Sequence, residues 1–146
     1  MSADNIDYDS LRQIFGPSRV PTEENLEAVY LSAIGRIPPR VKTRLSVTGA
    51  LDPDLLVMQE HLRSHVLTPE CFNEKQVQLF VVAIMLAQLN EAAVMHVRAA
   101  RKAGASWEEL QAVIGLCYLF RGVPAANRGA EMLATVALEE SALSKS

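Results

Sequence analysis

Apolar residues recur at helical spacing along most of the chain. A typical stripe consists of Leu26, Val29, Tyr30, Ala33 and Ile34. Residues three and four positions apart lie on one face of a helix, so each stripe of this kind predicts a helix with one buried side. No segment alternates apolar and polar residues with the two-residue period of a strand. The pattern therefore predicts an all-α fold.

Proline, glycine and capping residues divide the first half of the chain into predicted helices. A short helix is expected over Tyr8–Phe15, and Thr22 caps a second, which we expect to end at Pro38-Pro39. A weak third helix closes at Gly49. Asp52-Pro53 starts a fourth, because it is a capping residue followed by proline at the first helical position. The expected inward residues of this fourth helix are Leu55, Leu56, Met58, Gln59, Leu62 and Val66.

The second half of the chain has equally clear helix boundaries. Asn73 caps a fifth helix that is apolar on every side over residues 79–87, which predicts a central helix surrounded by others, from this chain or another subunit. Gly104 ends the sixth helix in a left-handed cap. Ser106 and Glu109 have the spacing of a capping box and start the seventh. An eighth helix follows a sharp corner.

Composition limits the class of protein. The chain has 146 residues, 49% apolar and 5% aromatic, which suits one domain of closely packed helices. A net charge of −3 argues against nucleic acid as a partner. The longest apolar stretch is far shorter than the roughly 20 residues that span a bilayer, and the polar, acidic N-terminus does not resemble a signal peptide. With only two distant cysteines, Cys71 and Cys117, we expect a cytoplasmic protein without a membrane partner.

One histidine, His96, stands out because its helical neighbours are nearly all alanine. The positions around it on a helix are Ala92, Ala93, Ala99, Ala100 and Ala103. An imidazole on a face of small residues needs a hydrogen-bond partner or takes part in chemistry. Two interpretations are open: a general acid/base, or a core histidine bonded to a backbone carbonyl.

The stretch from His96 to Leu133 resembles the carboxymuconolactone decarboxylase family, whose superfamily also holds the alkylhydroperoxidase D-like proteins. It carries an H-x-R-A-A helix, a K-A-G-A cap, an S-x-E-E-L start and a G-V-P-A-A-N corner. The resemblance extends back to about Leu51 and implies a helical bundle of that type, and the length of the chain favours a single domain over residues 1–146. Within it, residues 1–21 form an N-terminal arm, residues 22–50 lead-in helices and residues 51–142 the family-like core. It also implies a homo-oligomer, commonly a trimer or hexamer.

Two departures from the superfamily bear on function. The peroxidase-like branch carries CxxC seven and four residues before the histidine, where this chain has Leu89 and Ala92. Without a thiol there is no nucleophile for a peroxide. Gln76 and Gln78 stand where that branch carries a relay glutamate. At the corner, family decarboxylases usually read Tyr-Ala where this chain has Phe120-Arg121, a change that bears on which substrate is bound.

Beside His96, three residues are candidates for the site. Arg121 can bind a substrate carboxylate through two hydrogen bonds. Alternatively, its positive charge only interacts favourably with the negative end of the helix dipole. Asn127, in the first turn of the last helix, can bind a substrate oxygen or bridge two helices. Glu60 fits the family's acidic position, which implies that it orients His96 or protonates substrate.

His61 and His65 form a further pair, four residues apart beside Glu60. This spacing can place two imidazoles in one pocket, with or without a divalent ion. The alternative is an exposed polar helix face. We expect a substrate-binding role for the pair and no metal.

Together these features favour a cofactor-free lyase that acts on a small carboxylated or lactone compound by general acid/base catalysis. One alternative is a non-catalytic member of the fold that binds a small molecule or serves in assembly. Another is an alkylhydroperoxidase-like antioxidant protein, which the missing CxxC disfavours.

Overall fold

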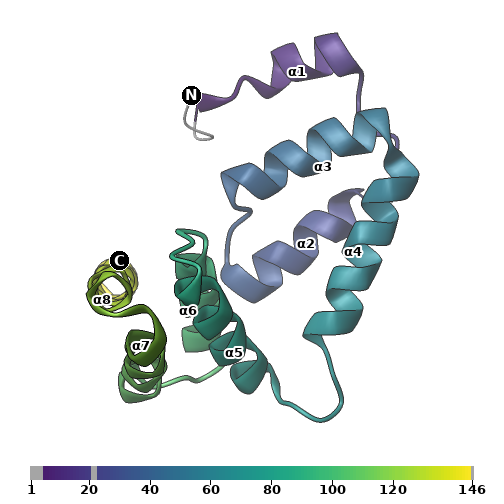
Figure 1. Cartoon of the computed structure of the whole chain (residues 1–146). Helices are drawn as coiled ribbons and strands as arrows, with labels where there is room; N and C mark the ends of the chain where they lie inside the picture. Colours follow the sequence, from purple (N-terminus) through teal and green to yellow (C-terminus); the bar gives the residue numbers. More distant parts are fainter. Residues whose placement is uncertain (1–4, 21–22, 146) are drawn as a thin grey trace. The chain divides into compact units, whose positions relative to one another are not determined.

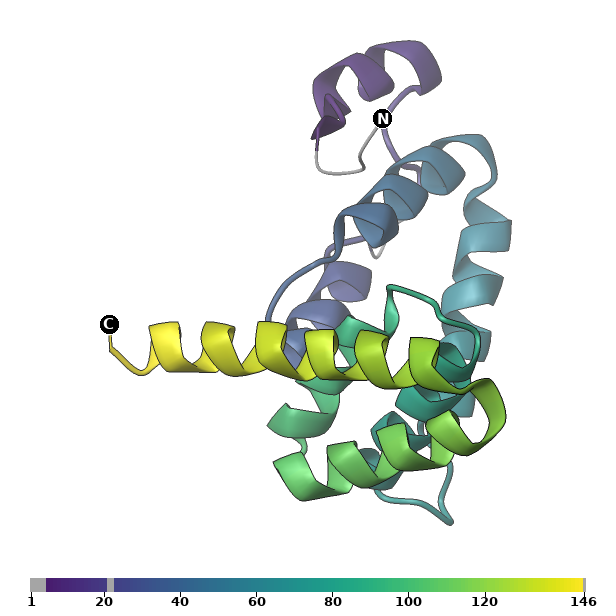
Figure 2. The same cartoon turned by 60° about the vertical axis from the view of Figure 1, so that its left-hand side comes forward.

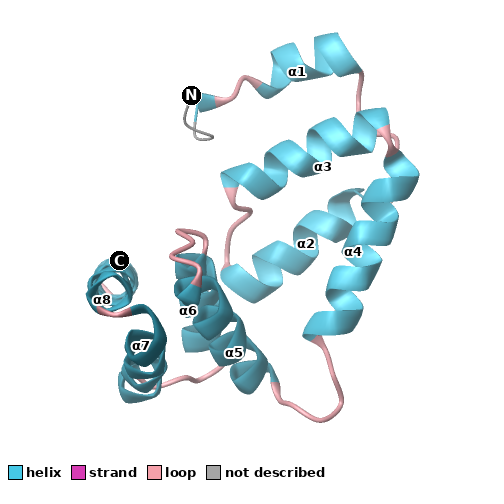
Figure 3. Cartoon of the chain, viewed as in Figure 1, coloured by secondary structure: helices cyan, strands magenta, loops and turns pink. Residues whose placement is uncertain are grey.

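The regular structure of the chain is helical throughout the part that is described. The computed structural model describes residues 5–20 and 23–145, and no strand occurs in these ranges (Figure 3). The helices are α1 (Tyr8–Phe15), α2 (Glu23–Ile34), α3 (Pro39–Leu51), α4 (Pro53–Leu67), α5 (Glu74–Ala87), α6 (Ala93–Lys102), α7 (Trp107–Arg121) and α8 (Val123–Leu143) (Figure 1). None of these helices has the length and hydropathy needed to cross a bilayer. The predicted all-α class is confirmed.

The chain divides into two compact units. The N-terminal unit comprises Met1–Leu67 and the C-terminal unit Thr68–Ser146. The boundary falls in the segment between α4 and α5, where Thr68-Pro69-Glu70 follows the last residue of α4. The single domain over residues 1–146 stays a prediction.

In the N-terminal unit, α1 and α4 both pack against α3. The helix α1 has the predicted bounds, and its start is fixed by Asp7, whose Oδ1 accepts hydrogen bonds from the backbone amides of Asp9 and Ser10 at 3.0 and 3.2 Å. Hydrogen bonds from Ser10 hold the pKa of the Asp7 carboxyl below its usual value. The small core of this unit consists of Val20, Leu45 and Leu56, with Leu26 and Val41 packed against them.

Two predicted helix ends in this unit are wrong. The second helix ends at Ile34, before Pro38-Pro39, because Gly35 adopts a φ of 81° and donates its amide to the Leu31 carbonyl. Gly49 lies inside α3, where a Cβ would come within 2.3 Å of the Ser18 hydroxyl. It is a site of close packing, not a cap. The expected cap Thr22 lies outside the described residues.

The inward face predicted for α4 is largely wrong. Of the expected residues only Leu56 is buried, together with Glu60. The exposed ones are Leu55, Met58, Gln59, Leu62 and Val66. The periodicity correctly predicted a helix. Only a narrow side of α4 is buried, however, and that side includes the Glu60 carboxylate.

In the C-terminal unit, α5 contacts α6, α7 and α8, and α7 and α8 form an antiparallel pair (Figure 2). The core between them is built from Val82, Leu86, Val97, Leu110, Ile114, Met132 and Val136. The predicted capping box is confirmed: Ser106 Oγ accepts the Glu109 amide at 3.1 Å, and Glu109 accepts the Ser106 amide at 2.8 Å. Gly104 and Gly122 both have positive φ and form the predicted cap and corner.

Close contact between α7 and α8 depends on Gly129. A Cβ at this position would lie 2.6 Å from Cγ1 of Ile114, whose branched side chain covers the glycine. Glycine is therefore the only residue that lets the two helices approach to this distance without displacing Ile114.

The helix α5 is only partly enclosed by helices of its own chain. Val77, Gln78, Val82 and Leu86 are buried, but Phe80 and Ile84 are exposed. Helices of this chain therefore cover α5 only in part, and the expected cover of its remaining face by another subunit stays a prediction.

Candidate active site

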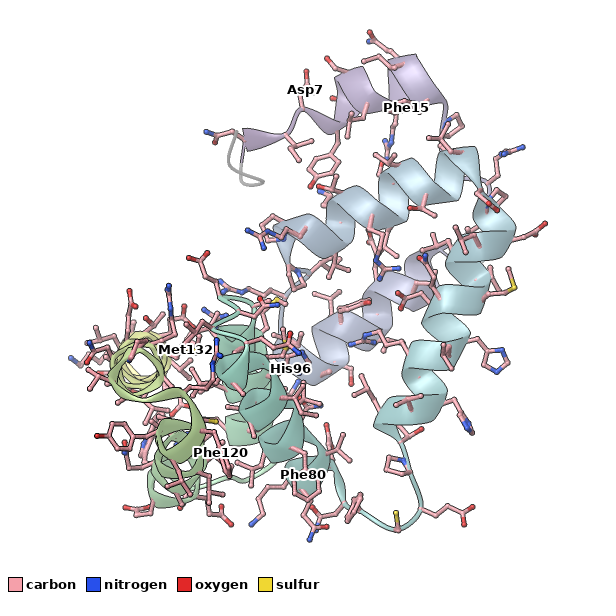
Figure 4. The ribbon with its side chains drawn as sticks, viewed as in Figure 1. Asp7, Phe15, Phe80, His96, Phe120 and Met132 are labelled. Carbon is pink, nitrogen blue, oxygen red and sulfur yellow. The ribbon has the colours of Figure 1, made fainter. Side chains whose placement is uncertain are left out.

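The centre of the candidate site is a hydrogen bond between His96 on α6 and Gln78 on α5. His96 Nδ1 lies 2.8 Å from Gln78 Oε1. The His96 side chain is labelled in Figure 4. The imidazole is half-buried, and its helical neighbours Ala93, Ala99 and Ala100 are buried as predicted. The partner of His96 in this bond is therefore a side-chain amide from the neighbouring helix.

Local structure fixes Gln78 in this position. Asn73 and Gln76 form a capping box that starts α5, since each side chain bonds the backbone amide of the other. Gln78 follows within the next turn and is only 7% exposed. A buried amide group needs a hydrogen-bond partner, and His96 supplies it.

The bond determines which ring nitrogen acts as the base. An amide oxygen only accepts hydrogen bonds, so Nδ1 of His96 carries the proton that it donates to Gln78. In the neutral ring, Nε2 then holds the lone pair. This arrangement suits general acid/base chemistry at Nε2.

Arg121 and Asn127 lie on either side of the corner between α7 and α8. Both side chains are exposed, and neither makes a hydrogen bond or ion pair with another described residue. Arg121 is in the last turn of α7, where a cation favours the helix dipole, and Asn127 is in the first turns of α8. They belong to the same unit as His96 but take no part in the bond that positions it.

Glu60 belongs to the N-terminal unit and has other partners there. Its carboxylate, 6% exposed, forms an ion pair with Arg44, and the Tyr30 hydroxyl lies 3.0 and 3.1 Å from its two oxygens. Arg44 also donates to the Tyr30 hydroxyl at 3.0 Å. Burial raises the pKa of Tyr30, while the guanidinium of Arg63, 4.2 Å from the ring centre, opposes that rise. The catalytic role of Glu60 stays a prediction.

His61 and His65 are both exposed on α4. Among the side chains that the structure describes, no three from histidine, cysteine, aspartate or glutamate come close enough together to hold a metal ion. Both histidines lie in the N-terminal unit and His96 in the C-terminal one. Their predicted role in substrate binding stays a prediction.

Neither cysteine provides an activated thiol at the candidate site. Cys117 is buried, its Sγ lies 3.5 Å from the Ala83 carbonyl, and burial raises its pKa. A higher pKa means less thiolate, the form that attacks peroxides. Cys71 is exposed in the segment before α5. The positions of the superfamily's CxxC are occupied by Leu89, which closes α5 with a φ of 54°, and Ala92.

The functional residue that sequence reasoning missed is Gln78. In the sequence, this glutamine indicated only the absence of the peroxidases' relay glutamate. The available signal was a neutral amide within a strongly apolar helix, since such a residue needs a buried partner. Its partner is 18 residues away, so pattern alone does not reveal the pair.

Comparison with known proteins agrees with the motifs. The model of the "Carboxymuconolactone decarboxylase family" matches residues 53–135, more than half of the chain. This range includes His96, Gln78, Arg121 and Asn127. No curated protein and no solved structure is similar enough to add to that match.

Proposed function

Because the chain belongs to the carboxymuconolactone decarboxylase family, we propose that it is a cofactor-free lyase that decarboxylates a small carboxylated or lactone compound through His96. The observation that carries this proposal is the Gln78–His96 hydrogen bond, which leaves Nε2 as the nitrogen that gains and loses a proton. Decarboxylation without a cofactor needs an electron sink in the substrate, such as a conjugated carbonyl.

The proposed reaction balances with one proton consumed. The bond between the substrate carbon and its carboxylate breaks, CO₂ leaves, and the electron pair moves into the conjugated carbonyl. Nε2 of His96 then delivers a proton, taken up from solvent in each turnover, to the substrate carbon. Arg121 holds a second carboxylate or the lactone oxygen, and Asn127 stabilises the developing enolate charge near the start of α8.

A thermal-shift screen against small carboxylic acids and lactones tests this substrate class. A ligand that binds only the folded protein stabilises it by about 2.7 kcal/mol at one hundred times its Kd. We expect a hit whose effect is lost in Arg121→Gln. The control is Arg40→Gln, which removes the same charge at an exposed position of α3. Compounds that raise the melting temperature of both variants equally would argue against binding by Arg121. If no carboxylic acid and no lactone stabilises the protein, the proposed substrate class is wrong.

We also propose that the chain forms a homo-oligomer through the end of α7. The apolar residues Leu116, Leu119 and Phe120 of α7 are exposed and recur at helical spacing, and Val123, at the start of α8, is exposed as well. Phe80 and Ile84 on the adjoining α5 are also exposed. Exposed apolar side chains on neighbouring helices are typical of protein–protein interaction sites. A second copy of the chain is the occupant that the family implies.

Replacing Phe120 by aspartate is expected to reduce the molar mass of the assembly. The Phe120 side chain is 81% exposed, so the change costs the isolated chain little but places a charge in the proposed interface. Light scattering coupled to gel filtration measures the mass. The control is Leu138→Asp, 73% exposed on α8 and about 22 Å along the helix axis from Val123. A wild-type monomer, or equal masses for wild type and Phe120→Asp, would contradict the proposed interface.

A further inference from the structure

The amide of Gln78 bonds the one ring nitrogen that stays protonated in both charge states of His96. When Nε2 gains a proton, Nδ1 keeps its own and continues to donate to Gln78 Oε1. When Nε2 loses that proton, the bond is again unchanged. The ring therefore stays anchored at one orientation throughout a proton-transfer cycle.

We propose that Gln78 is a positioning residue that holds His96 as the Nδ1–H tautomer, so that Nε2 exchanges protons while the ring stays fixed. This inference rests on the proposed function, because it assigns a role within the same site. Gln78 does not itself exchange a proton, since a side-chain amide is neither an acid nor a base near neutral pH.

The neutral charge of Gln78 matters as much as its hydrogen bond. A carboxylate at the same 2.8 Å distance would favour the imidazolium and oppose release of the proton. An amide gives the same directional bond without that bias. The Gln78 amide also forms its hydrogen bond with a neutral imidazole. Position 78, which is 7% exposed, therefore buries no unpaired charge when His96 is neutral.

Two replacements separate the bond from the charge. Gln78→Leu removes the acceptor and keeps a similar volume in an apolar setting, whereas Gln78→Glu keeps the shape and adds a charge. The matched control is Gln111→Leu, the same change at an exposed position of α7. Circular dichroism and thermal unfolding establish that each variant is folded.

The tautomer is measured directly by ¹⁵N–¹H correlation spectroscopy of the imidazole rings, without any substrate. We expect His96 in the wild type to show the Nδ1–H pattern and to shift toward Nε2–H, the form histidine prefers in water, in Gln78→Leu. Gln78→Glu should show a larger protonated fraction at the same pH. The exposed His61 and His65 serve as internal references. An Nε2–H pattern in the wild type, or an unchanged pattern in Gln78→Leu, would overturn the proposal.

Kinetics with the compound found by the thermal-shift screen give an independent readout. We expect Gln78→Leu to lower kcat about 10- to 100-fold, as for loss of one hydrogen bond to a charged group, with KM nearly unchanged. A change in KM alone would overturn a positioning role. The spectra test whether Gln78 positions His96, and turnover by the wild type tests the lyase function. Either proposal can therefore be wrong while the other holds.

Discussion

Replacing His96 by glutamine is expected to lower kcat about 10²- to 10⁴-fold, the usual contribution of a positioned acid/base group. Glutamine can still donate a hydrogen bond to Gln78 Oε1, which keeps the buried amide satisfied. It has no nitrogen that takes up a proton near neutral pH, so only proton transfer is lost. Because His96 is half-buried among small residues, a side chain of similar size leaves the packing of α5 and α6 intact.

Steady-state turnover of the compound that stabilises the wild type provides the measurement. Arg40→Gln is the control, because it introduces the same glutamine at an exposed position of α3 outside the candidate site and should leave kcat within about twofold. An unaltered kcat in a folded His96→Gln protein would exclude His96 as the proton-transfer group. Ligand stabilisation retained without turnover in the wild type would instead favour the non-catalytic, binding member of the fold.

Sequence reasoning succeeded where the deciding interaction is local. The start of α7 depends on Ser106 and Glu109, which are three residues apart, and the start of α4 on Asp52, whose Oδ1 accepts the Leu55 amide at 3.0 Å. The corner before α8 depends on the positive φ of Gly122. Such contacts involve one turn of chain, so residue types at fixed spacing predict them.

It failed where burial depends on a distant partner. The burial of Glu60 was not predicted, because it depends on Tyr30 and Arg44 from α2 and α3; the catalytic role of Glu60 stays a prediction. Likewise Gln78 is buried because His96 lies opposite it on another helix. A hydrophobic pattern predicts burial from residue type alone, so it predicts that both Glu60 and Gln78 are exposed. A hydrogen-bond or ion-pair partner allows such a polar side chain to be buried.

The same network around Glu60 predicts a large stability effect. Replacing Arg44 by leucine is expected to destabilise the N-terminal unit by about 3 kcal/mol, the low end for breaking a buried ion pair because Arg44 is partly exposed. The change leaves a carboxylate that is 6% exposed without its cation, and it also removes the bonds from Arg44 to Tyr30 and Gln59. Tyr30 alone cannot balance that charge.

Urea unfolding followed by circular dichroism measures the decrease in the free energy of unfolding. Hydrogen exchange reports separately on α2, α3 and α4. The double variant Arg44→Leu with Glu60→Leu should recover most of it, because removing both charges removes the penalty of an unpaired one. Arg40→Leu, at an exposed position of the same helix, controls for loss of a cation on α3 and should change stability by no more than about 0.5 kcal/mol. If Arg44→Leu unfolds at the same urea concentration as the wild type, the ion pair contributes nothing to the fold. Burial of Glu60 must then be sustained by Tyr30 and the packing of α4 instead.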